Sequence, residues 1–266
     1  MQGNTAQKTG LLSLFLTLTV LAPSIALSPV YARTSHQAAD SAVPALVPSS
    51  LLASLLDHSD ILPIHKNIAH ETLSTISTTC ISQLKSLYVR YEKPKNRGLA
   101  GKTSIILDGT VSAHEFRALL IHEFGHIVDL GCFTGTQSAG ESVFRDGYEI
   151  IFRDDPSIEF YEFSWLNDKR RRDARPDDFV SGYAESDPFE EFAETFAYFI
   201  LQRNAFRIRA ATNPIIDKKY NWMRDHFDIV LQATDQRQWD GTVPWDVTKL
   251  PYIWHRQIAV AGSSEL

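Results

Sequence analysis

SAHEFRALLIHEFGHIVDL, residues 112–130, combines helical periodicity with a regular placement of ionisable side chains. Its apolar side chains recur at the three- and four-residue spacing of an amphipathic helix: Phe116, Leu120, Phe124, Ile127 and Val128. Ser112 is placed to cap the start of this helix, and Gly131 is placed to end it. The pattern predicts a helix over residues 112–130.

Two histidines, His122 and His126, stand four residues apart on this helix. Side chains at that spacing project from one face, so both imidazoles can reach a single Zn²⁺ ion. Glu123 lies between them and is placed to act as a general base. Residues 103–107, just before the helix, predict a β-strand followed by a turn. We expect an edge strand here, which could pair with an extended peptide.

A catalytic zinc site needs a third protein ligand and keeps a fourth position open for water. No later histidine is well placed, so we expect a carboxylate from residues 181–196. On a helix that starts at Asp187, Glu190 and Glu194 share one face, and Glu190 is the preferred ligand. Glu194, one turn behind, would then hydrogen-bond a ligand.

Two alternatives to this assignment remain open at the level of sequence. Glu190 could merely close the helix start in a capping box with Asp187. In that case Glu191, which points about 100° away from Glu190, or Glu194 would have to bind the metal. Asp129, one turn after His126, could orient a ligand histidine or be an ordinary surface aspartate.

The chain resembles a known family in residues 122–129, HEFGHIVD, and in residues 190–196, EEFAETF, with Tyr183 seven residues before the second motif. The family is that of the anthrax lethal factor-like secreted zinc metallopeptidases, zincins of the HExxH-plus-Glu type, and the resemblance covers about residues 103–199. It implies that His122, His126 and Glu190 bind zinc. It also implies that Glu123 is the base, that Tyr183 stabilises the oxyanion, and that Glu194 hydrogen-bonds a metal ligand. Glu191 departs from the family pattern, which has an aromatic residue at this position.

Outside the motifs, apolar periodicity predicts further helices and one more strand. The expected helices are residues 64–84, 156–168, 187–203 and 214–227, and the expected strand is residues 86–91. Together these elements predict a mostly helical α+β fold, zincin-like, with a small sheet packed on the motif helix.

The first 32 residues resemble a secretory signal peptide, with Lys8 ahead of an apolar stretch and a small-residue cleavage site before Arg33. An uncleaved membrane anchor is the alternative, although Pro23 interrupts a segment that is barely long enough to span a bilayer. Residues 33–48 predict a flexible lead, and residues 49–266 predict the zincin-like metallopeptidase domain. We expect a secreted or periplasmic protein with no stable membrane span after signal cleavage.

Cys80 and Cys132 are the two cysteines of the chain. In an exported protein such a pair can form a disulfide, here between the helix before the sheet and the loop after the motif helix. The alternative is two buried thiols that never meet, a question that geometry decides.

The expected function is that of an exported zinc metallopeptidase, which hydrolyses peptide bonds of a peptide or protein substrate with Zn²⁺ as cofactor. A formal net charge of −6 argues against a nucleic-acid partner. Two alternatives are a non-catalytic exported zinc-binding protein and an amidase that acts on the peptide stems of the cell wall. A structural zinc site usually has four protein ligands, and no fourth is evident.

Overall fold

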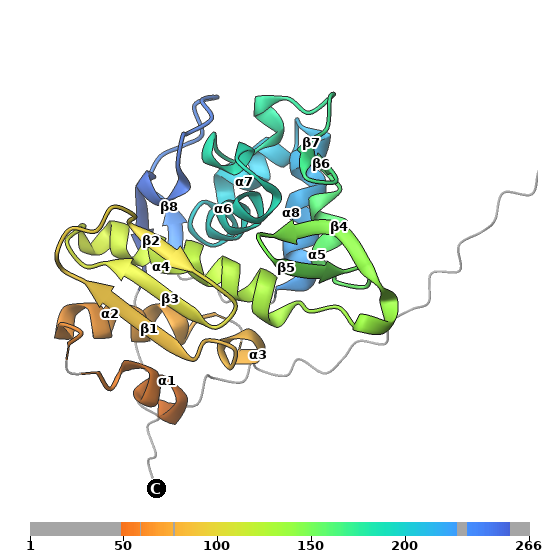
Figure 1. Ribbon diagram of the computed structural model, residues 1–266. Helices are drawn as coiled ribbons and strands as arrows, with labels where there is room; N and C mark the ends of the chain where they lie inside the picture. The colour runs from red at the N-terminus through yellow and green to blue at the C-terminus, as the bar shows by residue number, and fades with distance from the viewer. Residues whose placement is uncertain (1–48, 59, 77, 228–232, 256–266) are drawn as a thin grey trace, which may run out of the picture. The chain divides into compact units, whose positions relative to one another are not determined.

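The helix α4 (Ala113–His126) lies at the centre of the computed structural model, between a small sheet and the helix α6 (Pro188–Leu201) (Figure 1). The structure describes residues 49–58, 60–76, 78–227 and 233–255, which belong to one compact unit. The signal peptide and the flexible lead predicted for residues 1–48 lie outside these residues. The mostly helical α+β fold, with a small sheet on the motif helix, is confirmed.

The small sheet has the strand order β1-β3-β2, formed by β1 (Ser86–Arg90), β2 (Gly98–Ala100) and β3 (Ser104–Asp108). β1 runs parallel to β3, and β2 runs antiparallel to it. Leu87 and Ile105 are paired neighbours on the buried face, as the alternation of strand side chains requires. The strands predicted at 86–91 and 103–107 are confirmed, but the expectation that the second is an edge strand is wrong. β3 is central, and β1 and β2 form the two edges; β2 was not predicted from the sequence.

The motif helix starts as predicted, because the Ser112 side chain accepts a hydrogen bond from the backbone of Glu115. Its predicted end is wrong. The chain continues past His126 into a wider π-helical turn, Ile127–Cys132, and Gly131 lies inside that turn. A side chain at Gly131 would meet the Lys102 carbonyl oxygen at 2.1 Å, so glycine is needed there for close packing rather than for helix termination.

The helix predicted over residues 64–84 is interrupted. The structure has α1 (Ser49–Leu56), α2 (Pro63–Leu73) and α3 (Thr78–Ile81), of which α2 packs against α4. Ser74 and Thr75 turn their hydroxyl groups back onto the carbonyl oxygens of Glu71 and Thr72. Such side-chain bonds compete with the helical pattern, which explains the break that periodicity alone did not reveal.

The predicted helix 156–168 is also shorter than expected. It is confined to α5 (Ser157–Tyr161), and a hairpin of β6 (Trp165–Leu166) and β7 (Lys169–Arg170) follows. Asn167 adopts a left-handed conformation, φ 60°, at the tip of this hairpin, and asparagine tolerates that conformation better than most residues.

The other α-helices and β-strands of the described residues lie after the motif helix. They are β4 (Glu141–Asp146), β5 (Glu149–Phe152), α7 (Arg203–Ala210), α8 (Pro214–His226), β8 (Ala233–Asp235) and β9 (Tyr252–Trp254). The helices predicted at 187–203 and 214–227 are confirmed as α6 and α8. Among the described helices, none is long and apolar enough to cross a membrane.

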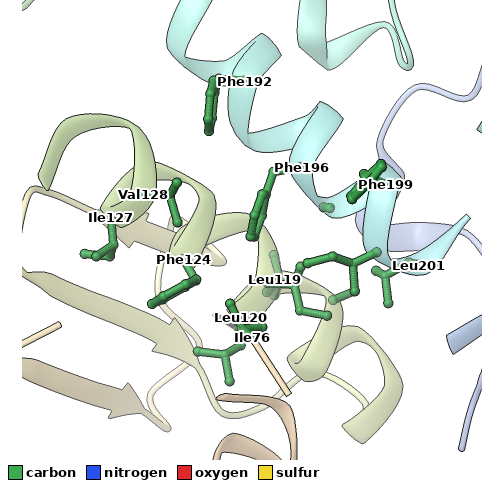
Figure 2. Packing of buried hydrophobic residues seen from close by; sticks show 14 of the residues in the cluster. Ile76, Leu119, Leu120, Phe124, Ile127, Val128, Phe192, Phe196, Phe199 and Leu201 are labelled. Carbon is green, nitrogen blue, oxygen red and sulfur yellow. The ribbon is translucent and has the colours of Figure 1, made fainter. Parts of the chain in front are cut away.

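Close packing between α4 and α6 forms the centre of the core. Figure 2 shows Phe196 projecting from α6 toward α4, where it lies near Phe124, and the two rings are 6.4 Å apart between centroids. Gly125 allows this approach, since a Cβ atom there would lie 2.9 Å from the Ala193 α-carbon. Close backbone contact and buried aromatic rings therefore hold α4, which carries the histidines, against α6, which carries the glutamates.

A disulfide joins Cys80 of α3 to Cys132 at the end of the π-helical turn. The bond closes a loop with a sequence separation of 52 residues and connects the chain before the sheet to the chain after the motif helix. The alternative of two thiols that never meet is wrong.

Removal of this disulfide is expected to lower the free energy of unfolding by about 4 kcal/mol, because the reduced unfolded chain regains the entropy of a loop of this length. Urea unfolding of Cys80→Ser/Cys132→Ser and of the oxidised wild type measures the difference. The double variant should match the wild type under reducing conditions. A double variant as stable as the oxidised wild type would contradict the expectation.

Candidate metal centre

Three buried or nearly buried side chains from α4 and α6 converge on one point. His122 and His126 are 5% and 8% exposed, and Glu190 reaches them from the first turn of α6. Oε2 of Glu190 lies 3.2 Å from Nε2 of His122 and 3.6 Å from Nε2 of His126. The three donor atoms lie within 4.8 Å of one another, close enough to bind one metal ion.

The two carboxylate oxygens of Glu190 have different surroundings. Oε1 accepts a hydrogen bond from the Tyr183 hydroxyl at 3.1 Å. Oε2 is buried, faces the two imidazoles and has no hydrogen-bond partner among the described residues. An unsatisfied buried carboxylate oxygen is costly, and a cation at this point would compensate for it.

Asp187 places Glu190 by capping α6. Its Oδ1 accepts hydrogen bonds from the backbone nitrogens of Phe189 and Glu190, both at 2.9 Å, and Pro188 occupies the first helical position. The capping-box alternative for Glu190 is wrong, because its carboxylate faces the histidines instead of the helix start.

Glu194 supports the other side of His122. Its Oε1 lies 2.9 Å from Nδ1 of His122, while Oε2 accepts from the Ser181 hydroxyl at 2.5 Å and from the Val247 backbone nitrogen at 2.9 Å. An ionised carboxylate only accepts, so we assign the imidazole proton to Nδ1. This tautomer leaves the lone pair of Nε2 directed at the shared point with Glu190.

Glu191 lies away from the two histidines. Its carboxylate is fully buried, forms an ion pair with the buried Lys219, and accepts hydrogen bonds from Ser164 at 2.9 Å and from the Trp165 indole at 2.6 Å. These contacts occupy its oxygens away from the histidines. Glu191 is therefore not a candidate ligand, and Glu194 is engaged in supporting His122.

Asp129 fits neither alternative drawn from the sequence. It is fully buried, so it is not a surface residue, and burial raises its pKa to about 7. Its Oδ1 accepts from the Tyr161 hydroxyl at 2.6 Å, and no hydrogen bond from Asp129 to a histidine occurs in the described part of the chain. Asp129 thus connects the π-helical turn to α5 and does not orient a ligand.

Glu123 faces the edge strand of the sheet. The side chain is 5% exposed, and Gly98 of β2 lies directly against it. A Cβ atom on Gly98 would be 2.0 Å from Oε1 of Glu123 and 2.7 Å from its carboxyl carbon. The absence of a side chain at Gly98 therefore decides where the Glu123 carboxylate can lie.

Tyr183 stands beside the three donors in a short 3₁₀ helix, Tyr183–Glu185. The side chain is partly exposed, and its hydroxyl donates to Glu190. The backbone nitrogens of Gly182 and Tyr183 donate to the carbonyl oxygens of Pro244 and Trp245, at 2.8 and 2.7 Å. A segment about 60 residues later in the chain thus fixes the position of this tyrosine.

The site shifts the pKa of its ionisable groups through burial and neighbouring charge. Burial raises the pKa of Glu123, and the neighbouring histidines offset this only in part. Burial also opposes ionisation of Glu190, but the neighbouring imidazoles of His122 and His126 lower its pKa far below the usual value. Burial, then the charge of Glu190, raises the pKa of Tyr183, so its hydroxyl stays protonated and can donate.

These groups line a cleft of about 490 Å³ between the sheet edge and α6. Its walls include the edge strand, residues 98–100, and a late segment with Trp245, Asp246 and Thr248. Asp246 pairs with Arg97, which itself lines the cleft. This late segment was not predicted from the sequence, since it carries neither a motif nor a helical period that would relate it to the histidines.

No protein-family profile, curated protein or solved structure matches the chain. The geometry of the residues described above is therefore the basis for assigning a function.

Proposed function

We propose that the chain is an exported zinc metallopeptidase, in which His122, His126 and Glu190 bind Zn²⁺ and Glu123 is the general base. The observation that carries the proposal is the convergence of three donor atoms from two helices, with a buried Glu190 oxygen that lacks a hydrogen bond. The likeness of both motifs to the anthrax lethal factor-like zincins supports it, as does the signal-like N-terminal sequence. The Cys80–Cys132 disulfide is typical of an oxidising compartment.

The donor set and its spacing are compatible with zinc. Zinc bonds to nitrogen and oxygen are about 2.0–2.1 Å long, so ligand atoms of a tetrahedral site lie about 3.3 Å apart. The Glu190 oxygen is 3.2 and 3.6 Å from the two histidine nitrogens. Two histidines and one glutamate make a catalytic type of donor set that leaves the fourth position open, whereas a structural site would be closed.

Each remaining group has a part in peptide hydrolysis. A bound zinc ion would supply Lewis acidity, which polarises the scissile carbonyl and lowers the pKa of water. Glu123 would accept the proton of the attacking water and deliver it to the leaving amine. The Tyr183 hydroxyl, a protonated donor beside Glu190, would donate a hydrogen bond to the carbonyl oxygen as negative charge develops there.

The edge strand β2 supports a peptide as substrate. β2 pairs with β3 along one side, and its residues line the cleft. An extended peptide could add to that strand by main-chain hydrogen bonds, a common mode of peptide recognition. Gly98 would bring this peptide next to Glu123, because the two residues are already in contact.

Chelation is expected to remove both activity and metal. Purified protein should contain a single equivalent of zinc by elemental analysis and should hydrolyse casein; dialysis against EDTA should abolish hydrolysis and lower Tm, because the ion binds the folded state. Zinc, but not magnesium or calcium, should restore both. Full activity in metal-free protein would refute the proposal.

The same preparation separates the two alternative functions. Hydrolysis of purified cell-wall peptide stems, without turnover of casein, would indicate an amidase. Full zinc occupancy without hydrolysis of either substrate would indicate a zinc-binding protein.

Gly98→Ala is expected to lower kcat by about 10²-fold with zinc retained, because the added methyl group displaces the Glu123 carboxylate by roughly an ångström. Gly101→Ala is the matched control, since a Cβ at Gly101 meets nothing within 4 Å. Steady-state kinetics and zinc content of both variants test this. Equal kcat for the two variants would show that Gly98 does not position the base.

A further inference from the structure

Trp245 presents a large exposed aromatic surface to the cleft. Its side chain lines the cleft that contains the three donors, and the residue is 73% exposed. Tryptophan is enriched at binding interfaces, because its ring buries a large apolar area on contact. Neither the metal site nor the proton transfers proposed above use this side chain.

The backbone around Trp245 is tied to the metal centre on both sides. Its carbonyl oxygen accepts from the Tyr183 nitrogen at 2.7 Å, so it is one hydrogen bond from the proposed oxyanion donor. Two residues later, the Val247 nitrogen donates to Glu194, which supports His122. The backbone that carries the indole therefore has a defined position relative to the metal site, and binding there would require little ordering of the backbone.

The Trp245 indole also packs against a glycine. It lies against Gly182, where a Cβ atom would be 2.6 Å from Cε3 of Trp245. Gly182 has φ −66° and ψ −31°, a conformation open to any residue, so the glycine is not required by its backbone. Its absent side chain leaves room for the ring.

The charge beside Trp245 is already neutralised. Asp246, the next residue, forms an ion pair with Arg97. Burial opposes its ionisation, but the Thr248 hydroxyl and the charge of Arg97 outweigh burial and leave its pKa below the usual value. The carboxylate next to the indole is therefore paired and unavailable to a cationic ligand. An apolar group suits this surface better than a lysine or arginine side chain.

We propose that Trp245 forms a specificity subsite that receives an apolar, preferably aromatic, side chain of the peptide substrate, on the Tyr183 side of the scissile bond. The inference rests on the proposed peptidase function and names the class of substrate for it. A planar apolar side chain would bury the exposed indole face and would hold the peptide beside the oxyanion donor.

The test uses internally quenched peptides that vary one position at a time among Phe, Leu, Ser, Asp and Lys. Wild-type protein should prefer Phe and Leu at one position. Trp245→Ala should raise KM for these peptides by about tenfold or more, with kcat and zinc content little changed, and should leave the Ser peptide unaffected. Trp245→Phe should retain part of the preference. Tyr148→Ala, which removes a fully exposed aromatic side chain outside the cleft lining, is the matched control and should match wild type.

A second variant moves the indole without deleting it. Gly182→Ala should displace the ring and change the ranking of Phe against Leu, while Trp245→Ala/Gly182→Ala should behave like Trp245→Ala alone. An unchanged preference in Trp245→Ala, or a wild-type preference for Asp or Lys at every position, would overturn the proposal.

Peptide affinity, measured without hydrolysis, tests the Trp245 subsite independently of the proposed peptidase activity. Fluorescence anisotropy with Glu123→Gln protein and a labelled Phe-containing peptide measures affinity without turnover. If wild-type protein hydrolyses no peptide but the Phe peptide still binds more weakly to Trp245→Ala/Glu123→Gln, the subsite stands and the peptidase proposal fails. Equal affinity for the two proteins would reject the subsite whatever the activity.

Discussion

Glu123→Gln is expected to lower kcat for peptide hydrolysis by roughly 10²–10⁴-fold and to leave the zinc content unchanged. Glutamine has the same shape, so it fits the space against Gly98, but its amide cannot accept a proton from water. The ligands His122, His126 and Glu190 keep their geometry, since Glu123 is not among the converging donors. Steady-state kinetics measures the loss of kcat, and elemental analysis of the same sample measures the zinc content.

Glu92→Gln is the control for loss of one negative charge, because Glu92 lies on an exposed loop outside the cleft lining. It should have wild-type kinetics. A zinc-loaded Glu123→Gln protein with undiminished kcat would remove Glu123 from the mechanism and leave the proton to another group. Loss of zinc in this variant would instead make Glu123 part of the metal site.

The two helices of the site could be predicted because their signals are local. Ser112 and Asp187 cap helix starts at the expected positions, and the spacing of His122 and His126 fixes their common face. Periodicity did not reveal where helices break. The turn after α2 and the hairpin after α5 depend on side-chain hydrogen bonds and on a single left-handed residue, Asn167, neither of which changes the apolar pattern.

The groups that surround the ligands could not be predicted, because they come from distant parts of the chain. Val247 reaches Glu194 over 53 residues, and the Pro244–Trp245 backbone holds Tyr183 from a segment without regular structure. No sequence pattern relates Gly98 to Glu123, because their contact depends on the sheet lying over α4. Such contacts become visible only once the elements are packed.

The choice between Glu190 and Glu191 as the third ligand could likewise not be made from the sequence. Helix geometry places the two carboxylates on different faces but does not say which face meets the histidines, since α6 is buried almost all round. The ion pair between Lys219 and Glu191 excludes Glu191 as the ligand. A fully buried ammonium group needs a buried anionic partner, and Glu191 is that partner. Helical spacing from Ile216 and Met223 places Lys219 on the buried face of α8, but the sequence does not identify its partner.

Glu190→Ala is therefore expected to abolish stoichiometric zinc binding and, with it, hydrolysis. The substitution removes one of three ligands, and the two histidines that remain hold zinc too weakly to survive dialysis. Zinc should therefore raise the Tm of the wild type but not that of the variant, because an ion stabilises only a folded state that binds it. Zinc titration and thermal unfolding of both metal-free proteins measure these effects.

Variants of Glu190, Glu194 and Glu191 should differ in zinc affinity. Loss of one negative charge, which they share, would not produce this difference. Glu194→Ala should weaken zinc binding by about 10–100-fold, because His122 loses the acceptor that orients its ring. Glu191→Gln should bind zinc like wild type but unfold at a lower temperature, because Lys219 is left buried without its ionic partner. Zinc loss in Glu191→Gln, or a zinc-replete Glu190→Ala protein, would reverse the assignment of the third ligand.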